Sequence, residues 1–227
     1  MPIYTNWLVN WMIRCAEFTS HLARETLART RRDSLTAEGN ALAKAGGKPS
    51  AEVLRRAKRI RVLLMDADGT LTDGRVWLVS QPDGTTTEMK CFDAQDGAGL
   101  TLAATAGIRT GVITGRESPA MRRRAQEARI EFVYERCPEK IPVYEEILQR
   151  TGVSEEEVAY AGDDLPDIPV MSRVGLAVAV ANAVPEVKRA AHYVTSREGG
   201  RGGIRETIEL IMKAQGIWEK NINKARA

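Results

Sequence analysis

The sequence contains few residues able to form disulfides or bind zinc. It has three cysteines, Cys15, Cys91 and Cys137, and two histidines, His21 and His192, all widely spaced. Zinc sites need closely spaced Cys and His ligands, and an odd number of dispersed cysteines indicates no disulfide framework. We therefore expect reduced thiols in a cytoplasmic protein, structural roles for both histidines and no thiol nucleophile at Cys91.

Long apolar runs and a strong excess of one charge are also absent. A membrane-spanning helix needs roughly 18 consecutive apolar residues, and Asn6, Asn10, Arg14 and Glu17 interrupt the N-terminal stretch MPIYTNWLVNWMIRCAEF. The same interruptions argue against a signal peptide. Lys and Arg total 33 and Asp and Glu total 30, so the net charge of +3 favours no nucleic-acid partner.

An apolar content of 43% and a charged content of 28% are typical of a globular protein with one main domain and an appendage. Near the N-terminus, apolar residues recur at helical spacing: Tyr4, Trp7, Leu8, Trp11, Met12, Cys15, Phe18 and Leu22. This predicts an amphipathic helix packed on the domain or on a neighbouring subunit; a helix lying on a membrane surface is disfavoured because its polar face is not strongly basic. We expect a helical extension and linker over residues 1–48 and the main domain over residues 49–227.

From Ile60 onward, short apolar runs alternate with helical patterns, as in repeated βαβ units around a parallel sheet. The predicted strands are Ile60–Met65, Arg109–Ile113, Glu131–Tyr134, Val158–Ala161, Leu176–Val180 and Tyr193–Thr195. The predicted helices are Gly99–Ala106, Pro119–Ala128, Ile141–Arg150, Asp167–Arg173, Pro185–Ala190 and Ile204–Gln215. The pattern indicates a doubly wound α/β domain with three layers.

The segment Gly74–Phe92 departs from this alternation. Its apolar runs VWLVS and TTTEMKCF flank QPDG, a sequence rich in turn-forming residues. We predict a β-hairpin inserted after the first strand. Since ligands of such sheets bind outside the carboxyl ends of the strands, this hairpin is expected to overhang the site.

Four polar clusters follow predicted strands, and parallel strands bring their carboxyl ends to one edge of a sheet. The clusters are Asp66-Ala67-Asp68-Gly69-Thr70, Thr114-Gly115-Arg116, Lys140 and Gly162-Asp163-Asp164. Several carboxylates at one edge cannot all stay ionised without a cation. With no His or Cys nearby, the expected ion is Mg²⁺ and not zinc.

Phosphoryl transfer suits these residue types. A carboxylate is a competent nucleophile toward phosphorus, and the charge on the transferring group requires a metal, a lysine and N–H donors. Hydrolysis of a phosphate monoester needs transition-state stabilisation on the order of 20 kcal/mol, which only several groups acting together provide. The clusters therefore favour a magnesium-dependent phosphate-monoester hydrolase.

The motifs LLMDADGTLTDG, VITGR, Lys140 and AYAGDDLPD, in this order, resemble the haloacid-dehalogenase superfamily of phosphohydrolases. The hairpin, CFDAQDGAGL, VAVANA and EGGRGGIRE are similar to its members that hydrolyse 3-deoxy-D-manno-octulosonate 8-phosphate and to their sialic-acid-type relatives. The resemblance extends from about Pro49 to about Gly216. It implies a Rossmann-like domain without a large cap, cytoplasmic lipopolysaccharide precursor synthesis, and a homotetramer in which each hairpin helps to close a neighbour's site.

The resemblance also implies roles for individual residues. Asp66 would be the nucleophile and a metal ligand, and Asp68 the general acid/base, with its backbone carbonyl on Mg²⁺. Asp163 would be the remaining protein ligand of the metal. Asp164 would order metal-bound water or Lys140.

The same comparison of motifs implies that Thr114 and Lys140 hold the phosphoryl oxygens, with Asp167 supporting the site from behind. The expected substrate-binding residues are Asp93, Ala94, Gln95, Asp96, Gly97, Arg116, Arg124 and Arg201. At Gln95 the similar phosphatases of the eight-carbon acid carry a basic residue, and a neutral side chain cannot pair with a carboxylate. A nine-carbon ulosonic acid phosphate is therefore the alternative substrate.

The glycine-rich run 199–203 is open to two interpretations, a loop whose Arg201 meets the substrate carboxylate or a plain loop before a helix. The motifs argue against two other functional classes. A receiver domain would carry its phosphoacceptor on a middle strand, without a second Asp two positions after the first. An inactive oligomeric scaffold would be expected to lose a catalytic carboxylate, and none is missing here.

Overall fold

The computed structural model describes residues 47–226, so the predicted N-terminal amphipathic helix, Cys15 and His21 lie outside the described residues. In chain order the elements are α2 (Ala51–Ala57), β1 (Val62–Met65), β2 (Trp77–Ser80), β3 (Thr86–Met89), α3 (Ala94–Thr105), β4 (Arg109–Ile113), α4 (Pro119–Glu127), β5 (Phe132–Tyr134), α5 (Ile141–Thr151), η1 (Glu155–Glu157), β6 (Val158–Gly162), η2 (Leu165–Asp167), α6 (Ile168–Met171), β7 (Leu176–Ala179), α7 (Pro185–Ala190), β8 (Tyr193–Val194), α8 (Gly203–Ala214) and α9 (Trp218–Arg226). None of the helices in this range is long and apolar enough to cross a membrane.

The central sheet has six strands in the order β5-β4-β1-β6-β7-β8. All its pairs are parallel, and β1 lies between β4 and β6, with Val62 opposite both Arg109 and Val158. The chain leaves β1 toward β4 on one side and returns to β6 on the other, which makes the end of β1 a topological switch point. The predicted doubly wound α/β fold is confirmed.

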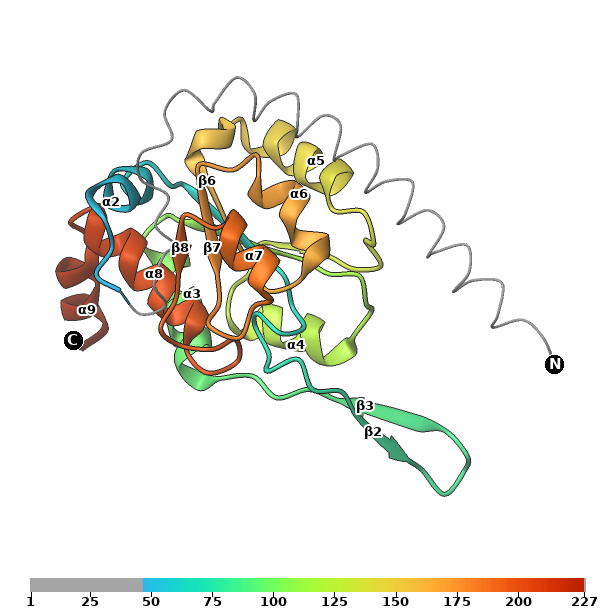
Figure 1. Ribbon diagram of the computed structural model, residues 1–227. Helices are drawn as coiled ribbons and strands as arrows, with labels where there is room; N and C mark the ends of the chain where they lie inside the picture. Colours follow the sequence, from blue (N-terminus) through green and yellow to red (C-terminus); the bar gives the residue numbers. More distant parts are fainter. Residues whose placement is uncertain (1–46, 227) are drawn as a thin grey trace, which may run out of the picture. The chain divides into compact units, whose positions relative to one another are not determined.

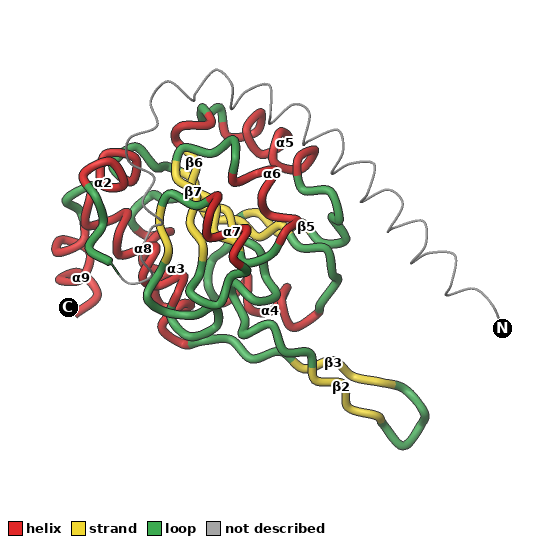
Figure 2. The backbone as a smooth tube through the Cα atoms, viewed as in Figure 1, coloured by secondary structure: helices red, strands yellow, loops and turns green. Residues whose placement is uncertain are grey.

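Alternate residues of β1 point to opposite faces of the sheet. Leu63 and Met65 pack into an apolar cluster with α2, α3, α4 and α8. Val62 and Leu64 pack into a second cluster with α5, α6 and α7. Figures 1 and 2 show the resulting arrangement of helices around the sheet. Because both faces of β1 are buried, the strand is fixed and the residue that follows it is held in place.

Helix α3 begins at Ala94, well before the predicted start at Gly99. Asp93 caps this helix, and its Oδ1 accepts hydrogen bonds from the backbone N–H groups of Gln95 (2.5 Å) and Asp96 (3.3 Å). The cap stabilises a start at Ala94 despite the low helix propensity of Gly97 and Gly99. The predicted substrate-binding segment 93–97 is therefore a helix N-terminus.

The segment after β6 and the C-terminal segment also differ from the prediction. In place of one helix over Asp167–Arg173 there is the 3₁₀-helix η2 followed by the four-residue α6. The side chain of Asp167 bonds to the backbone of the preceding loop, which holds this turn in a tight conformation. Helix α9 was not predicted, although its Trp218 is buried against the sheet's helical layer.

The segment between β1 and α3 forms the predicted hairpin. Strands β2 and β3 pair in antiparallel fashion, with Trp77 opposite Met89. An antiparallel bridge between Thr72 and Phe92 joins the segments that enter and leave the hairpin at its root. In Figures 1 and 2 the hairpin extends away from the sheet and its helices.

Candidate active site

Asp66 is the first residue after β1, and its backbone N–H donates to the carbonyl of Ala161 at the end of β6 (3.0 Å). The buried ammonium of Lys140, at the start of α5, donates to Asp66 Oδ1 at 2.5 Å. It also donates to Asp167 Oδ1 at 2.7 Å and to the hydroxyl of Tyr160 at 3.0 Å. Lys140 thus connects the carboxylate after β1 with a carboxylate in the loop after β6.

Asp167 accepts hydrogen bonds from Lys140 and also from the backbone of the loop after β6. Its Oδ2 accepts from the backbone N–H groups of Asp163 (2.9 Å) and Asp164 (3.2 Å). The side chain of Asp164 is exposed and caps η2 by accepting from the Leu165 N–H (2.8 Å). It is therefore Asp167, and not Asp164, that contacts Lys140; a role of Asp164 in ordering water stays a prediction.

Asp163 lies against the turn that follows Asp68. Its Oδ1 accepts a hydrogen bond from the Thr70 hydroxyl at 2.7 Å. Gly69 has a φ of 97°, and a Cβ at this position would overlap the Asp163 carboxylate. Only glycine combines this left-handed backbone with such a close approach. The turn of the DxDGT motif therefore packs directly against the Asp163 carboxylate.

The carboxylates at this edge of the sheet share a strongly perturbed electrostatic environment. Burial raises the pKa of Asp66 to about 6, although Lys140 opposes the shift. Burial also raises the pKa of Asp163 to about 7, against the Thr70 hydrogen bond and with repulsion from Asp66 and Asp167. Burial alone would lower the pKa of Lys140, but Asp66 and Asp167 outweigh it and the pKa is raised. The site therefore favours additional positive charge.

A hard divalent cation fits this site. The ligands available are the carboxylates of Asp66 and Asp163 and the backbone carbonyl of Asp68, all oxygen atoms of the kind that Mg²⁺ prefers. Within residues 47–226 no three His, Cys, Asp or Glu side chains are grouped to hold an ion by themselves. A backbone carbonyl and water would complete the coordination of a bound ion, which is usual for Mg²⁺.

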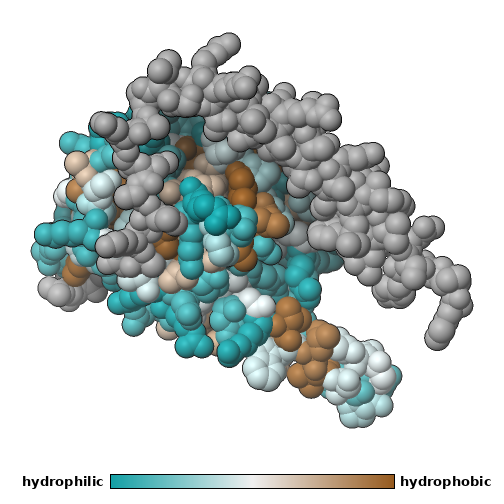
Figure 3. Space-filling model, in the orientation of Figure 1, coloured by the Kyte–Doolittle hydropathy of each residue, from teal (hydrophilic) through white to brown (hydrophobic). Residues whose placement is uncertain are grey.

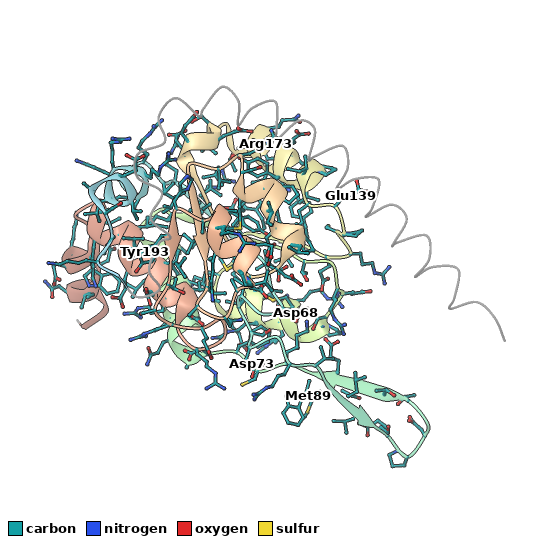
Figure 4. The ribbon with its side chains drawn as sticks, viewed as in Figure 1. Asp68, Asp73, Met89, Glu139, Arg173 and Tyr193 are labelled. Atoms are coloured by element: carbon teal, nitrogen blue, oxygen red, sulfur yellow. The ribbon has the colours of Figure 1, made fainter. Side chains whose placement is uncertain are left out.

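Asp68 lies between the sheet edge and the root of the hairpin (Figure 4). Its Oδ1 accepts a hydrogen bond from Lys90, whose side chain is buried. Its Oδ2 is 3.7 Å from Arg116 Nε and has no hydrogen-bond partner. Arg116 also pairs with Glu88 of β3. The predicted site residues Asp68 and Arg116 are thus brought together, and two hairpin residues join them.

Thr114 follows β4, the neighbour of β1, and is buried. Its Oγ1 accepts from the backbone N–H of Arg116 at 3.3 Å. Thr114 and Lys140 therefore lie at the ends of elements that flank Asp66, as predicted from the strand order. Their contact with phosphoryl oxygens stays a prediction.

The predicted substrate-binding segment meets Arg124 of α4. Arg124 Nη2 donates to the Asp93 carbonyl at 2.7 Å, and a Cβ on Gly97 would overlap its guanidinium. Ala94 and Gln95 are exposed at the start of α3. The structure thus groups five of the predicted residues around one helix N-terminus.

Asp96 and Gln95 have partners within and on either side of the glycine-rich run 199–203. The buried Asp96 accepts from the backbone N–H groups of Gly202 (3.2 Å) and Arg205 (2.6 Å), and burial raises its pKa to about 6. Its carboxylate therefore caps α8, and any contact with substrate stays a prediction. Gln95 accepts from Arg197 at 2.8 Å.

The glycine-rich loop is fixed to the turn after Asp68. Asn182 joins the two, since its amide donates to the Gly69 carbonyl (2.8 Å) and its Oδ1 accepts from the Gly199 N–H (2.6 Å). A Cβ on Gly199 would overlap the Gly69 carbonyl, so the close approach requires glycine. Arg201 is exposed and lies 3.5 Å from Glu198, and its contact with a substrate stays a prediction.

Several residues of the site were not among those predicted. Lys90 and Tyr160 contact the predicted catalytic residues Asp68 and Lys140. Glu88 contacts Arg116, and Asn182 fixes the turn after Asp68. Asn182 lies in the quoted motif VAVANA, which is the only sequence signal that pointed to it. A hairpin lysine has no spacing that relates it to Asp68, because the contact depends on how the hairpin root folds back.

The remaining candidates have structural roles. His192 Nδ1 accepts from the Ala177 N–H at 2.9 Å, and burial lowers the pKa of His192 to about 4. The structural role predicted for this histidine is confirmed. Cys91 and Cys137 are free thiols.

Comparisons with known proteins agree with this fold and site. The family model of haloacid dehalogenase-like hydrolase matches residues 124–208. The 3-deoxy-D-manno-octulosonate 8-phosphate phosphatase KdsC of Escherichia coli is 39% identical over 178 residues, which cover 78% of this chain and 93% of that protein. The chain belongs to the haloacid dehalogenase-like hydrolases, and within them to the phosphoric monoester hydrolases.

Solved structures resemble the chain over the same region. That of 3-deoxy-D-manno-octulosonate 8-phosphate phosphatase from Yersinia pestis is 41% identical, with a TM-score of 0.71, and the match covers 74% of this chain and 89% of that one. The Moraxella catarrhalis enzyme, solved in complex with magnesium ion, phosphate ion and KDO, is 35% identical with a TM-score of 0.72, covering 76% and 97%. The predicted family resemblance is confirmed.

Proposed function

We propose that the protein is a magnesium-dependent phosphatase that hydrolyses a phosphorylated sugar acid through an aspartyl-phosphate intermediate. The observation that supports this most directly is the hydrogen bond of 2.5 Å between Lys140 and Asp66, at the sheet edge that also bears Asp68 and Asp163. It combines a nucleophile, a buried cation and a second carboxylate suited to proton transfer.

In the proposed reaction Asp66 attacks the phosphorus atom, so that a bond forms from its carboxylate oxygen and the ester P–O bond breaks. Asp68 gives a proton to the departing alkoxide. It then takes a proton from water as that water attacks phosphorus and releases Asp66 and inorganic phosphate. Lys140 and Thr114 bind the phosphoryl oxygens and orient the group for in-line attack.

Mg²⁺ would be held by Asp66, Asp163 and the backbone carbonyl of Asp68. When bound, it neutralises charge on the phosphoryl oxygens and on the buried carboxylates. The raised pKa values of Asp66 and Asp163 support this requirement, since each reflects a carboxylate whose ionised form lacks enough positive charge nearby.

The proposed substrate is 3-deoxy-D-manno-octulosonate 8-phosphate, which would place the protein in cytoplasmic synthesis of a lipopolysaccharide precursor. The relatives from Escherichia coli and Yersinia pestis support this choice. Gln95 supports a second candidate, a nine-carbon ulosonic acid 9-phosphate, because a neutral amide does not pair with a carboxylate. Arg197 donates to Gln95 and Arg124 donates to the Asp93 carbonyl, whereas Arg116 lies beside Asp68.

A homotetramer is proposed as the working assembly. Apolar side chains are exposed along the hairpin, on Val76, Trp77, Leu78, Val79 and Met89. Figure 3 shows apolar residues gathered on the hairpin beside the main body. Such a patch on a two-stranded hairpin suits a surface covered by another copy of the chain.

The test is phosphate release by the purified protein from a panel of phosphorylated sugar acids, with and without Mg²⁺ and with Asp66→Asn as control. Preference for the eight-carbon acid supports the first substrate and preference for a nine-carbon acid supports the second. If no phosphorylated sugar acid is hydrolysed in the presence of Mg²⁺, the proposed function is wrong.

A further inference from the structure

A buried cation lies at the root of the hairpin, beside the residue proposed as general acid/base. Lys90 comes directly after β3, and only 1% of its side chain is exposed. Its ammonium donates to Asp68 Oδ1 and lies 3.6 Å from Glu88 Oε1. Burying a lysine is costly unless its charge is paired, and these two carboxylates provide the pairing.

The two oxygens of Asp68 consequently have different surroundings. Oδ1 accepts from Lys90, whereas Oδ2 is buried and accepts no hydrogen bond. Arg116 approaches Oδ2 only to 3.7 Å, and its guanidinium instead pairs with Glu88. Oδ2 is therefore the oxygen left available to give or take a proton.

We infer that Lys90 is a positioning residue for Asp68. Its hydrogen bond fixes the carboxylate in the orientation that leaves Oδ2 toward the reacting oxygen, and Glu88 holds Lys90 in turn. Because Glu88 and Lys90 belong to the hairpin, the inference also makes the acid/base dependent on correct placement of the hairpin. It rests on the proposed phosphatase function.

Lys90 exchanges no proton in this scheme. The proton on Asp68 Oδ2 moves to the ester oxygen as the P–O bond breaks, and a proton from water returns to Oδ2 in the second step. The hydrogen bond from Lys90 to Oδ1 persists through both steps. Loss of Lys90 should then mainly impair the protonation of a leaving group that needs a proton.

The experiment compares kcat/KM for two substrates. One is the best phosphorylated sugar acid of the panel, an alkyl phosphate whose leaving alkoxide needs a proton. The other is p-nitrophenyl phosphate, whose phenolate departs without protonation. The variants are Lys90→Met, which removes the ammonium, and Lys90→Arg, which keeps a cation. Asp68→Asn is the positive control. Lys213→Met is the matched control, because Lys213 is exposed on α8 and pairs with Glu209.

For Lys90→Met we expect kcat/KM to fall about 10²-fold for the alkyl phosphate and less than about 3-fold for p-nitrophenyl phosphate. Asp68→Asn should show the same substrate dependence, Lys90→Arg should recover part of the loss, and Lys213→Met should match the wild type. General damage to folding or assembly would lower kcat/KM equally for both substrates.

An equal fall on both substrates, or no fall for the alkyl phosphate, would overturn the positioning role of Lys90. A wild-type protein that releases no phosphate from any alkyl phosphate in the presence of Mg²⁺ would instead overturn the proposed function. The two failures are therefore distinguishable.

Discussion

Strands β1 and β2 have similar compositions and opposite surroundings. Both consist of four residues, VLLM in β1 and WLVS in β2. Every residue of β1 is buried and every residue of β2 is exposed; Leu64 has none of its surface exposed, whereas Leu78 has 67% exposed. Apolar composition alone therefore does not decide which strand enters the core.

The difference comes from the partners that topology provides. β1 has a parallel neighbour on each side and helices over both faces, whereas β2 pairs only with β3. A lone two-stranded hairpin is marginally stable, so the exposed apolar strand supports the proposal that another copy of the chain covers this surface. Each region also places a side chain in the candidate site: Asp66 follows β1, and Lys90 follows β3.

The largest expected effect tests the group that follows the buried strand. Asp66→Asn should lower kcat on the preferred substrate on the order of 10⁴-fold or more, because the amide is not a nucleophile. The circular dichroism spectrum and the assembly state should be unchanged, since Asp66 is at the sheet edge and not in the core. Substantial residual turnover in the presence of Mg²⁺ would show that another residue is the nucleophile.

The second effect compares the two strands in stability. Leu64→Ala should lower the free energy of unfolding by about 2–5 kcal/mol, because it leaves a cavity in a packed core. Leu78→Ala should lower the free energy of unfolding only when another copy of the chain covers the hairpin. Its effect should therefore grow with protein concentration. Denaturant unfolding at two protein concentrations measures both.

The control is Gln81→Ala, at the exposed turn of the hairpin, which should be neutral at either concentration. If Leu78→Ala destabilises as strongly as Leu64→Ala at every concentration, the contrast between a buried and an uncovered strand is wrong.

The features predictable from sequence are those encoded by local pattern. The six parallel strands, the hairpin and the convergence of Asp66, Thr114, Lys140 and Asp163 follow from apolar runs that each end in polar residues. A parallel sheet aligns the ends of its strands, so that local information gives a nonlocal site.

The features not predicted depend on contacts between distant segments. Lys90 reaches Asp68 only because the hairpin root folds back, as the bridge between Thr72 and Phe92 records. The start of α3 depends on the Asp93 cap, which outweighs the glycines. The carboxylate of Asp96 caps α8, more than a hundred residues later, and no local pattern indicates that contact.

The third effect sharpens the comparison from the hairpin side. Trp77 of β2 is 55% exposed in the single chain, and a tryptophan buried between subunits commonly contributes about 2 kcal/mol to association. Trp77→Ser should therefore weaken assembly about 30-fold. Sedimentation over a range of protein concentrations measures the change.

The core should be unaffected, so the secondary structure of the Trp77→Ser variant should match the wild type. An unchanged association constant would show that β2 is not covered by another copy of this chain, and the exposed strand would then need another explanation.

The smallest effect concerns pH and metal at the end of β1. The folded-state pKa values of Asp66, about 6, and Asp163, about 7, are raised above the ordinary 3.8. The metal-free native state thus binds protons more tightly than the unfolded chain. Ionisation of these two carboxyl groups therefore lowers the free energy of unfolding as pH rises from about 4 to about 7. Mg²⁺ binds the ionised forms, so its stabilisation should be small at pH 5 and full near pH 8.

The Mg²⁺-induced rise in Tm should therefore be larger at pH 8 than at pH 5 by about 2–4 °C, which corresponds to about 1 kcal/mol for a domain of this size. Asp163→Asn should abolish the rise at both pH values. Trp77→Ser should keep it, because the hairpin strand does not bear the metal ligands. A rise of equal size at pH 5 and pH 8 would mean that the ion binds elsewhere, and the buried end of β1 would lose its role as the metal site.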